Sequence, residues 1–178
     1  FNPDGLLSLS IFARKTDLRQ TIKSIDAVKA EFARHPNVIS AATMTWQNLL
    51  NPGRVTAMPT DGDTELSVYY LGSDSDFLDT YRVQLKAGRN IGQRSTIGNS
   101  REFLINEAAA RALGWENPVG KEMRLKERRN RVGTIVGVVE NFHFQSLHHP
   151  IKPLLIESDR ADQLHLRIRS TNIAETLA

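Results

Sequence analysis

Three histidines and a serine lie in one short stretch, His143, Ser146, His148 and His149. Imidazole nitrogens bind metal ions, and a serine beside a histidine is a hydrolase pairing. On an extended backbone His143 and His149 share a side while His148 opposes them. The stretch lacks a neighbouring Asp, and Pro150 constrains its backbone. No Gly-x-Ser-x-Gly turn surrounds Ser146. We therefore predict no metal, catalytic or cofactor-binding residue here, and a partly buried His143 among phenylalanines.

Two other patterns imitate ligand-binding loops without meeting their requirements. Residues 114–121 have five residues between the glycines where a phosphate-binding loop has four, and Glu122 stands where Ser or Thr would bind magnesium. We interpret this stretch as a helix end followed by a turn. The acidic runs lack the glycine and the distal Glu of a calcium loop, so turns and helix caps explain them. These runs are Asp61, Asp63 and Glu65, and Asp74, Asp76 and Asp79.

Basic side chains are densest between residues 121 and 131. On a hairpin Arg124, Lys126 and Arg128 would share one face. Such a face is either solvated or in contact with an acidic partner or anionic headgroups. Our candidate partner-contact residues come from this hairpin and from a predicted loop at residues 50–62: Arg54, Arg124, Lys126, Arg128 and Arg129. The stretch has no interleaved aromatic residues, so we predict no nucleic-acid partner.

Composition sets wide limits on the class of protein. The chain has 178 residues, a net charge of +3 and no cysteine. The length suits one domain or two small ones, and the absent cysteines exclude disulfides and thiolate zinc sites. No apolar run is long enough for a membrane helix. Because the chain begins at Phe1 without Met, it is interpreted either as a soluble protein with a trimmed start or as a domain of a longer membrane protein.

The two ends of the chain carry the clearest periodic patterns. Leu6–Ala13 and Val38–Trp46 are predicted strands on either side of a helix, which together form a βαβ unit with a parallel strand pair. We expect Val38, Ala42, Met44 and Trp46 to share one face. The helix has an apolar stripe, and Lys23, Lys29 and Glu31 outside that stripe are predicted to face water. The stripe consists of Leu18, Ile22, Ile25, Val28 and Phe32.

The last residues resemble the start of a second, similar unit. Residues 163–169 alternate, with Leu164, Leu166 and Ile168 on one face. Asn172 and Glu175 then resemble a capping box at the start of a helix. We expect a second βαβ unit that lacks most of its helix and its last strand.

The middle of the chain has a different pattern. It contains a predicted strand at Leu66–Leu71, a short helix capped by residues 74–76, and a helix capped by Asn106 and ended by Gly114. A hairpin spans Met123–Val139, where Gly133 and Gly137 indicate a bulge or a close backbone approach. We therefore predict an α+β fold. Residues 1–48 and 161–178 form a βαβ platform, and residues 49–160 form an inserted small α/β subdomain with a mostly antiparallel sheet.

Several segments together resemble the MacB/FtsX-like permeases of ABC transporters. Residues 140–147, with Ile151 and Pro153, are similar to a family signature, as are residues 103–109, 113–115 and 118–121. Gly88 and Arg89 resemble a further short family motif. One departure is Asn141, where the family usually has Asp. The matching positions are Asn106, Glu107, Gly114, Trp115, Gly120, Lys121, Asn141, Phe142, His143, Ser146, Leu147 and Pro153.

The resemblance implies a non-catalytic, extracytoplasmic domain of a bacterial inner-membrane permease, with a porter-like platform and a small inserted subdomain. ATP would bind to a separate cytoplasmic ATPase domain or subunit. The domain would relay ATP-driven motion for efflux, lipoprotein release or control of a cell-wall enzyme. Implied partners are the ATPase, a second permease copy, and a periplasmic adaptor, outer-membrane protein, lipoprotein or peptide. Alternatives are a sensor that binds a ligand or peptide between platform and insert, and a hydrolase using His143 and Ser146.

Overall fold

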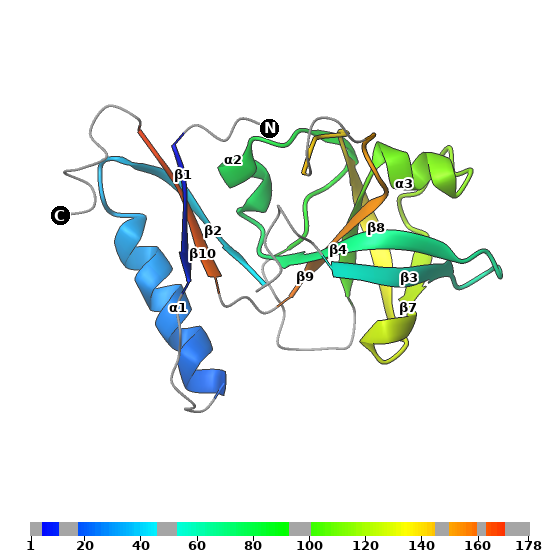
Figure 1. Cartoon of the computed structure of the whole chain (residues 1–178), viewed down its shortest axis with the longest axis horizontal. Coiled ribbons are helices and arrows are strands. Elements are labelled where there is room, and N and C mark those ends of the chain that lie inside the picture. The colour runs from blue at the N-terminus through cyan, green and yellow to red at the C-terminus, as the bar shows by residue number, and fades with distance from the viewer. Residues whose placement is uncertain are drawn as a thin grey trace.

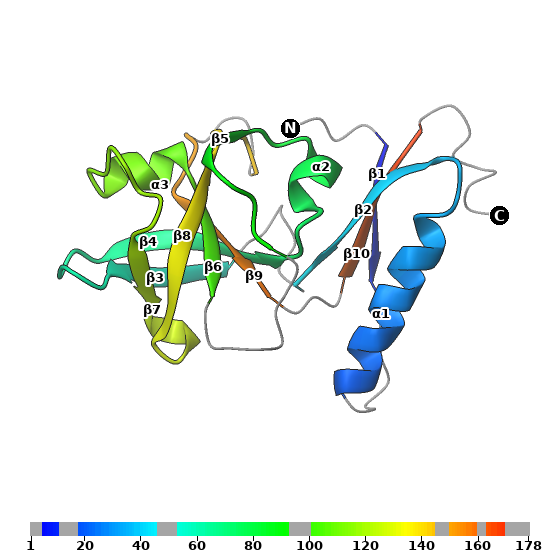
Figure 2. The same ribbon diagram turned by 180° about the vertical axis from the view of Figure 1, so that it is seen from behind.

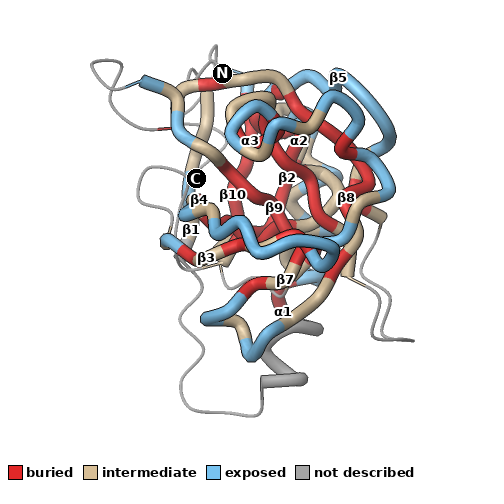
Figure 3. The backbone as a smooth tube through the Cα atoms, turned by 90° about the vertical axis from the view of Figure 1, so that its right-hand side faces the viewer, coloured by how far each residue is buried: buried red, intermediate tan, exposed pale blue. Residues whose placement is uncertain are grey.

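The computed structural model describes residues 5–10, 18–45, 53–92, 101–144, 150–159 and 163–169. They form a mixed, sheet-dominated fold with few helices, in which a small three-stranded sheet stands beside a barrel (Figures 1 and 2). Seen from the barrel side, the buried residues lie along strands such as β2, β9 and β10, and exposed stretches of chain lie around and in front of them (Figure 3). None of the described helices is long and apolar enough to cross a membrane.

Six strands of the insert close into a ring in the order β4-β3-β7-β8-β6-β9. The ring closes because β9 pairs with β6 on one side and with β4 on the other. The pairs β4–β9 and β6–β8 are parallel, and the others are antiparallel. The six barrel strands are β3 (Gly53–Pro59), β4 (Leu66–Ser73), β6 (Glu102–Asn106), β7 (Glu122–Leu125), β8 (Arg131–Val139) and β9 (Leu154–Ser158). A short strand, β5 (Leu85–Gly88), pairs with the end of β8.

Apolar side chains fill the inside of the barrel. Alternate residues of the strands point inward and pack together. Helix α3 (Glu107–Ala112) adds Ala109 and Ala110 to this cluster, with Leu113 and Trp115 packed beside them. The strand residues in the cluster are Val55, Ala57, Val68, Tyr70, Phe103, Ile105, Met123, Leu125, Ile135, Val138 and Leu155.

The platform is a sheet of three strands in the order β1-β10-β2, in which both pairs are antiparallel. Its elements are β1 (Leu6–Ser10), α1 (Leu18–Phe32), β2 (Val38–Met44) and β10 (Gln163–Ile168). The predicted parallel pair of β1 and β2 is therefore wrong. The two strands run in the same direction, but β10 lies between them. In this position β10 makes hydrogen bonds with β1 on one side and with β2 on the other. A direct β1–β2 pair would exclude β10 from the place between them.

One face of the platform packs against α1. Leu164, Leu166 and Ile168 of β10 form a cluster with Ala41, and the helix residues Val28 and Phe32 pack onto it. This confirms the predicted face of β10. The predicted face of β2 is wrong at Val38, which packs with Ala41 and not with Met44. A bulge causes the change, because Ser40 pairs with Arg167 and Val38 with Ile168, which leaves Ile39 unpaired.

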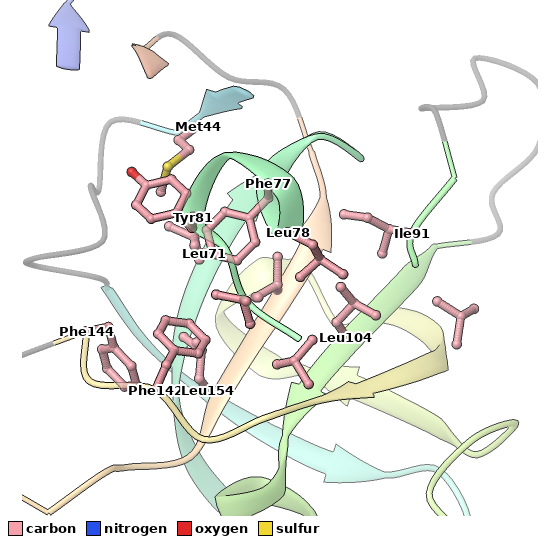
Figure 4. Close-up of a cluster of buried hydrophobic side chains, with 14 residues drawn as sticks. Met44, Leu71, Phe77, Leu78, Tyr81, Ile91, Leu104, Phe142, Phe144 and Leu154 are labelled. Carbon is pink, nitrogen blue, oxygen red and sulfur yellow. The ribbon is translucent and has the colours of Figure 1, made fainter. Parts of the chain in front are cut away.

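Helix α2 (Phe77–Tyr81) lies between the platform and the barrel in both views of the ribbon (Figures 1 and 2). Its Phe77, Leu78 and Tyr81 belong to a buried cluster that covers the outside of the barrel (Figure 4). Met44 from β2 joins the same cluster, so the core is continuous from platform to barrel. The cluster consists of Met44, Leu71, Phe77, Leu78, Tyr81, Val83, Ile91, Leu104, Val136, Val139, Phe142, Phe144, Leu154 and Ile156.

Most of the middle follows the sequence prediction. The strand at residues 66–71, the two short helices and the hairpin are confirmed as β4, α2, α3 and β7–β8. The predicted loop at residues 50–62 is wrong in part, because residues 53–59 form β3. Val55, Ala57 and Pro59 alternate into the protein, but the turn-forming residues on both sides hide that pattern. The predictions for Trp46 and for the helix after residue 170 lie outside the described residues.

We expect Gly137→Ala to destabilise the fold. A Cβ atom at Gly137 would lie 2.3 Å from the carbonyl oxygen of Arg89, which is backbone and has little freedom to move. Crowding of this kind costs about 2–3 kcal/mol in the free energy of unfolding. Urea unfolding of the purified chain measures the loss. The exposed Gly62 is the control, because its added Cβ would approach nothing closer than 3.9 Å. Equal stability of the two variants would contradict the expectation.

Candidate functional site

Asn106 is the most constrained of the signature residues. It is fully buried at the junction of β6 and α3. Its side-chain oxygen accepts hydrogen bonds from the backbone N–H of Ala109 and of Leu154, both at 3.0 Å, and its amide donates to the carbonyl of Lys152 at 2.9 Å. The predicted helix cap is confirmed. The same side chain also fixes the start of β9, which sequence patterns did not indicate.

Glu107 and Asn141 tie the α3 helix to the segment after β8. The Asn141 side chain accepts a hydrogen bond from the N–H of Ala108, and the Glu107 carboxylate accepts one from the N–H of Asn141, both at 2.9 Å. An Asp at position 141 would accept the same bond through a carboxylate oxygen. The departure from the family pattern at Asn141 therefore keeps this contact.

The other signature residues that the structure describes also make contacts that support the fold. Gly114 has φ of +65° and ends α3, with its N–H bonded to Arg111 and the N–H of Trp115 to Ala110. Lys121 lies 5.1 Å above the Trp115 ring. Gly120, with φ of +89°, donates to the carbonyl of Ile135.

Phe142 and Phe144 are buried, and His143 between them is half-buried as predicted. Pro153 precedes β9, and its carbonyl accepts a hydrogen bond from the N–H of Tyr69. Ser146, Leu147, His148 and His149 lie outside the described residues, so the structure does not place the serine against His143. Within the described part of the chain, no group of His, Asp and Glu side chains could hold a metal ion.

Some of the candidate contact residues already interact with rings or carboxylates of this chain, and others do not. Arg128 lies 4.0 Å above the Tyr70 ring and Lys126 pairs with Glu65, while Arg54 lies 5.1 Å above Tyr69. In the described structure Arg124 and the exposed Arg129 have no carboxylate partner. Lys126 and Arg128 belong to a 3₁₀ turn at residues 126–128, so the alternation that would place them beside Arg124 does not apply.

A group of charged side chains gathers around Glu157 of β9, with Arg131 and Asp159 partly exposed. Glu157 is fully buried, and its carboxylate accepts hydrogen bonds from Arg131 at 2.8 Å and from the Tyr70 hydroxyl at 2.7 Å. Asp159 lies within 2.9 Å of the same hydroxyl. Burial, and then the charges of Glu157 and Asp159, raise the pKa of Tyr70, so its hydroxyl keeps its proton. Sequence reasoning missed this group, because its members are far apart along the chain.

A second group of polar contacts joins the platform to the segment before α2. Asp74 accepts hydrogen bonds from the Lys29 ammonium at 2.6 Å, the Thr43 hydroxyl at 2.7 Å and the Thr43 N–H at 2.9 Å. Lys29 also pairs with Asp76. Burial alone would lower the pKa of Lys29, but the two carboxylates outweigh it and the pKa is raised. The prediction that Lys29 faces water is wrong, since α1 directs it toward these acids.

The face of β10 opposite α1 is also polar and buried. His165 and Arg167 are 3% and 1% exposed. The Tyr81 hydroxyl lies 2.7 Å from Nδ1 of His165, and Nε of Arg167 donates to the carbonyl of Thr80 at 2.6 Å. Burial lowers the pKa of His165 to about 4, so the ring is neutral near pH 7. A neutral ring accepts the Tyr81 proton at Nδ1 and presents Nε2 toward Ser8.

These arrangements hold separate segments of the chain together. Asn106 and Asn141 bind backbone, Glu157 binds Arg131, and Asp74 binds Lys29. Each of these contacts attaches one structural element to another.

We expect Asn106→Ala to lower the free energy of unfolding by roughly 3 kcal/mol, because three backbone groups around a buried side chain would lose their partner. Asn141→Asp is the matched control, since it keeps the acceptor for Ala108, and its effect should stay within about 0.5 kcal/mol. Chemical denaturation measures both variants. A small effect at Asn106 would show that water or nearby groups replace its contacts.

Stability should also fall when the solution is acidified from about pH 6.5 to pH 4. Because the pKa of His165 is lower in the folded state than in the unfolded chain, the unfolded chain binds a proton first as the pH falls. This linkage removes about 3 kcal/mol by pH 4. His165→Asn, which keeps an acceptor for Tyr81, should shrink the difference in stability between pH 7 and pH 4.5. An unchanged pH dependence in His165→Asn would contradict the assignment.

Comparison with known proteins gives a consistent result. The family model for the MacB-like periplasmic core domain matches residues 3–175 of the sequence. The fold is similar to the periplasmic region of MacB from Actinobacillus actinomycetemcomitans, with a TM-score of 0.62, 14% identity, and coverage of 98% of this chain and 78% of that one. It is also similar to the extracellular domain of YknZ, a noncanonic ABC-type transporter from Gram-positive bacteria, with a TM-score of 0.60, 11% identity, and coverage of 96% and 88%.

A domain of a permease protein from Porphyromonas gingivalis is similar too, with a TM-score of 0.56, 22% identity, and coverage of 83% of this chain and 69% of that one. No curated protein matches the chain. These identities show a shared fold, while the family match extends over nearly the whole sequence. The chain therefore belongs to the family of MacB-like periplasmic core domains, the part of ABC-transporter permeases that lies outside the inner membrane.

Proposed function

We propose that this domain relays ATP-driven motion of the permease to a periplasmic substrate or partner. The observation that carries the proposal is the chain path. The platform contains strands from before and after the barrel in sequence, with β10 between β1 and β2. A displacement applied to the chain before β1 or after β10 therefore acts on the platform first. The barrel follows through the contacts that join it to the platform.

In this proposal the chain divides into two mechanical parts. Residues 1–48 and 161–178 form the porter-like platform, and residues 49–160 form the insert. Their sheets meet at one paired position, Met44 with Ser73. A relay of this kind requires two discrete arrangements of packed elements. Strand pairing between the two parts is limited, whereas the barrel is closed on itself. We therefore place the conformational change at the boundary between platform and insert, and not within the barrel.

The relay has no catalytic step in this domain. ATP binds and reacts at a separate cytoplasmic ATPase domain or subunit, and a second permease copy completes the transporter. The output is efflux, lipoprotein release or control of a cell-wall enzyme, through a periplasmic adaptor, outer-membrane protein, lipoprotein or peptide. For partner contact we favour Arg124 and Arg129 over Arg54, Lys126 and Arg128. The first two have no carboxylate partner in the described structure, whereas Arg54 and Arg128 lie over tyrosine rings and Lys126 pairs with Glu65.

The relay fits the described structure better than the sensor alternative. A sensor would bind its ligand between platform and insert, and that space is occupied by α2. Its side chains Phe77 and Tyr81 are buried there, with Met44 in the same cluster. A ligand would have to displace this packing before it could bind.

Spin labels in the full-length permease, reconstituted in liposomes with its ATPase, test the relay. Cysteines at Glu31 in α1 and Ser67 in β4 place one label on the platform and one on the barrel, both at exposed sites. We expect the distance between the labels to shift when the ATPase is trapped with ATP and vanadate. Labels at Ser67 and at the exposed Glu122 of β7 are the control, and their separation should stay constant. An unchanged platform–barrel distance would contradict the relay.

A further inference from the structure

The helix α2 presents chemically different faces to its two neighbours. By chain position it belongs to the insert, since it follows directly after β4. Toward the platform, the helix and the segment before it make hydrogen bonds and ion pairs, beside an apolar contact with Met44. Toward the barrel, its contacts are apolar. This difference determines which of the two parts the helix follows when they move.

The contacts with the platform are directional and short. In the segment before the helix, Asp74 holds both Lys29 of α1 and Thr43 of β2. Toward its end, the Tyr81 hydroxyl meets His165 at 2.7 Å and the Thr80 carbonyl accepts from Arg167 at 2.6 Å. Asp74, which lies between β4 and the helix, donates its N–H to the Thr43 carbonyl, and Thr45 donates to Gly72 near the end of barrel strand β4. The platform thus holds the segment at both ends and from three elements.

The contacts of the helix itself with the barrel consist of packed side chains, while the segment before it accepts one hydrogen bond from Asn90, at the Ser75 carbonyl. Phe77 and Leu78 belong to the cluster on the outside of the barrel, with Leu71, Leu104 and Phe142 (Figure 4). Phe77 lies 6.3 Å from Phe142 between ring centroids. Such packing is non-directional, so a small displacement exchanges one set of contacts for a similar one. A displacement at the platform side would instead leave buried charges and hydrogen-bonding groups unpaired, which is far more costly.

We propose that α2 moves as one body with the platform, and that the movable boundary of this domain lies on the apolar face of α2. The boundary therefore does not coincide with the sequence boundary near residue 49. Within the relay, on which the functional meaning of this boundary rests, α2 is the element that presses on the barrel. Lys29 is its positioning residue, because its single cation is shared by two carboxylates, Asp74 and Asp76.

Two label pairs in the chain itself test this assignment without ATP or membranes, and the absence of native cysteine keeps the labelling specific. Pair one joins Glu31 in α1 to Asp79 in α2, and pair two joins Asp79 to Ser67 on the barrel. Substitution Leu78→Ala removes packing on the barrel side. It should broaden the distance distribution of pair two and leave pair one narrow. Leu78→Val makes the same change more mildly if the alanine variant does not fold.

The complementary substitution acts on the polar side. Lys29→Met should broaden pair one and leave pair two unchanged, and Lys29→Arg should restore the narrow distribution of pair one. The assignment is overturned if Leu78→Ala or Leu78→Val broadens pair one as well, or if Lys29→Met broadens pair two and not pair one. Because these measurements use the isolated chain, they stand apart from the vanadate experiment. A relay that fails there does not alter the result here.

Discussion

The closure of the barrel by β9 is the constraint on which the rest of the structure depends. All five residues of β9 are buried, and the strand pairs with β4 on one side and β6 on the other. Asn106 fixes its first residue, and the buried Glu157 near its end accepts a hydrogen bond from Arg131 of β8. A closed ring has no free edge to pair or to bend, so the barrel behaves as one unit. In the proposed relay, the large motion therefore lies outside the barrel.

The platform lies outside the barrel. Its hydrogen bonds to α2 explain why β10, a buried strand, carries polar side chains on one face. A strand buried on both faces is ordinarily apolar throughout. In β10 only the α1 face is apolar, while His165 and Arg167 on the other face bond to α2. Buried polar groups of this kind fix one arrangement, because a misplaced neighbour leaves them unpaired. The platform and α2 therefore share a defined geometry, and the apolar contact between α2 and the barrel leaves more freedom.

Sequence patterns predicted the local structure well and the connections poorly. The alternation in β10 and the capping role of Asn106 depend on neighbours in sequence, so both could be predicted. The place of β10 between β1 and β2 could not, because either a direct or a split βαβ unit satisfies the same periodicity. The attachment of Lys29 to Asp74 was equally hidden, since a lysine outside an apolar stripe ordinarily faces water. The family signature was visible, but only the structure showed that its described members bind backbone and packing partners.

The central claim is that this domain consists of a rigid barrel and a platform that carries α2 with it. Native-state hydrogen exchange of the chain at low denaturant concentrations tests it most directly. The account predicts that amides of β9, β6 and β8 exchange only through global unfolding. Amides of β1, β2, β10 and α2 should exchange together through a less costly opening. A single opening common to all of these strands, or α2 amides that exchange with the barrel, would contradict the account.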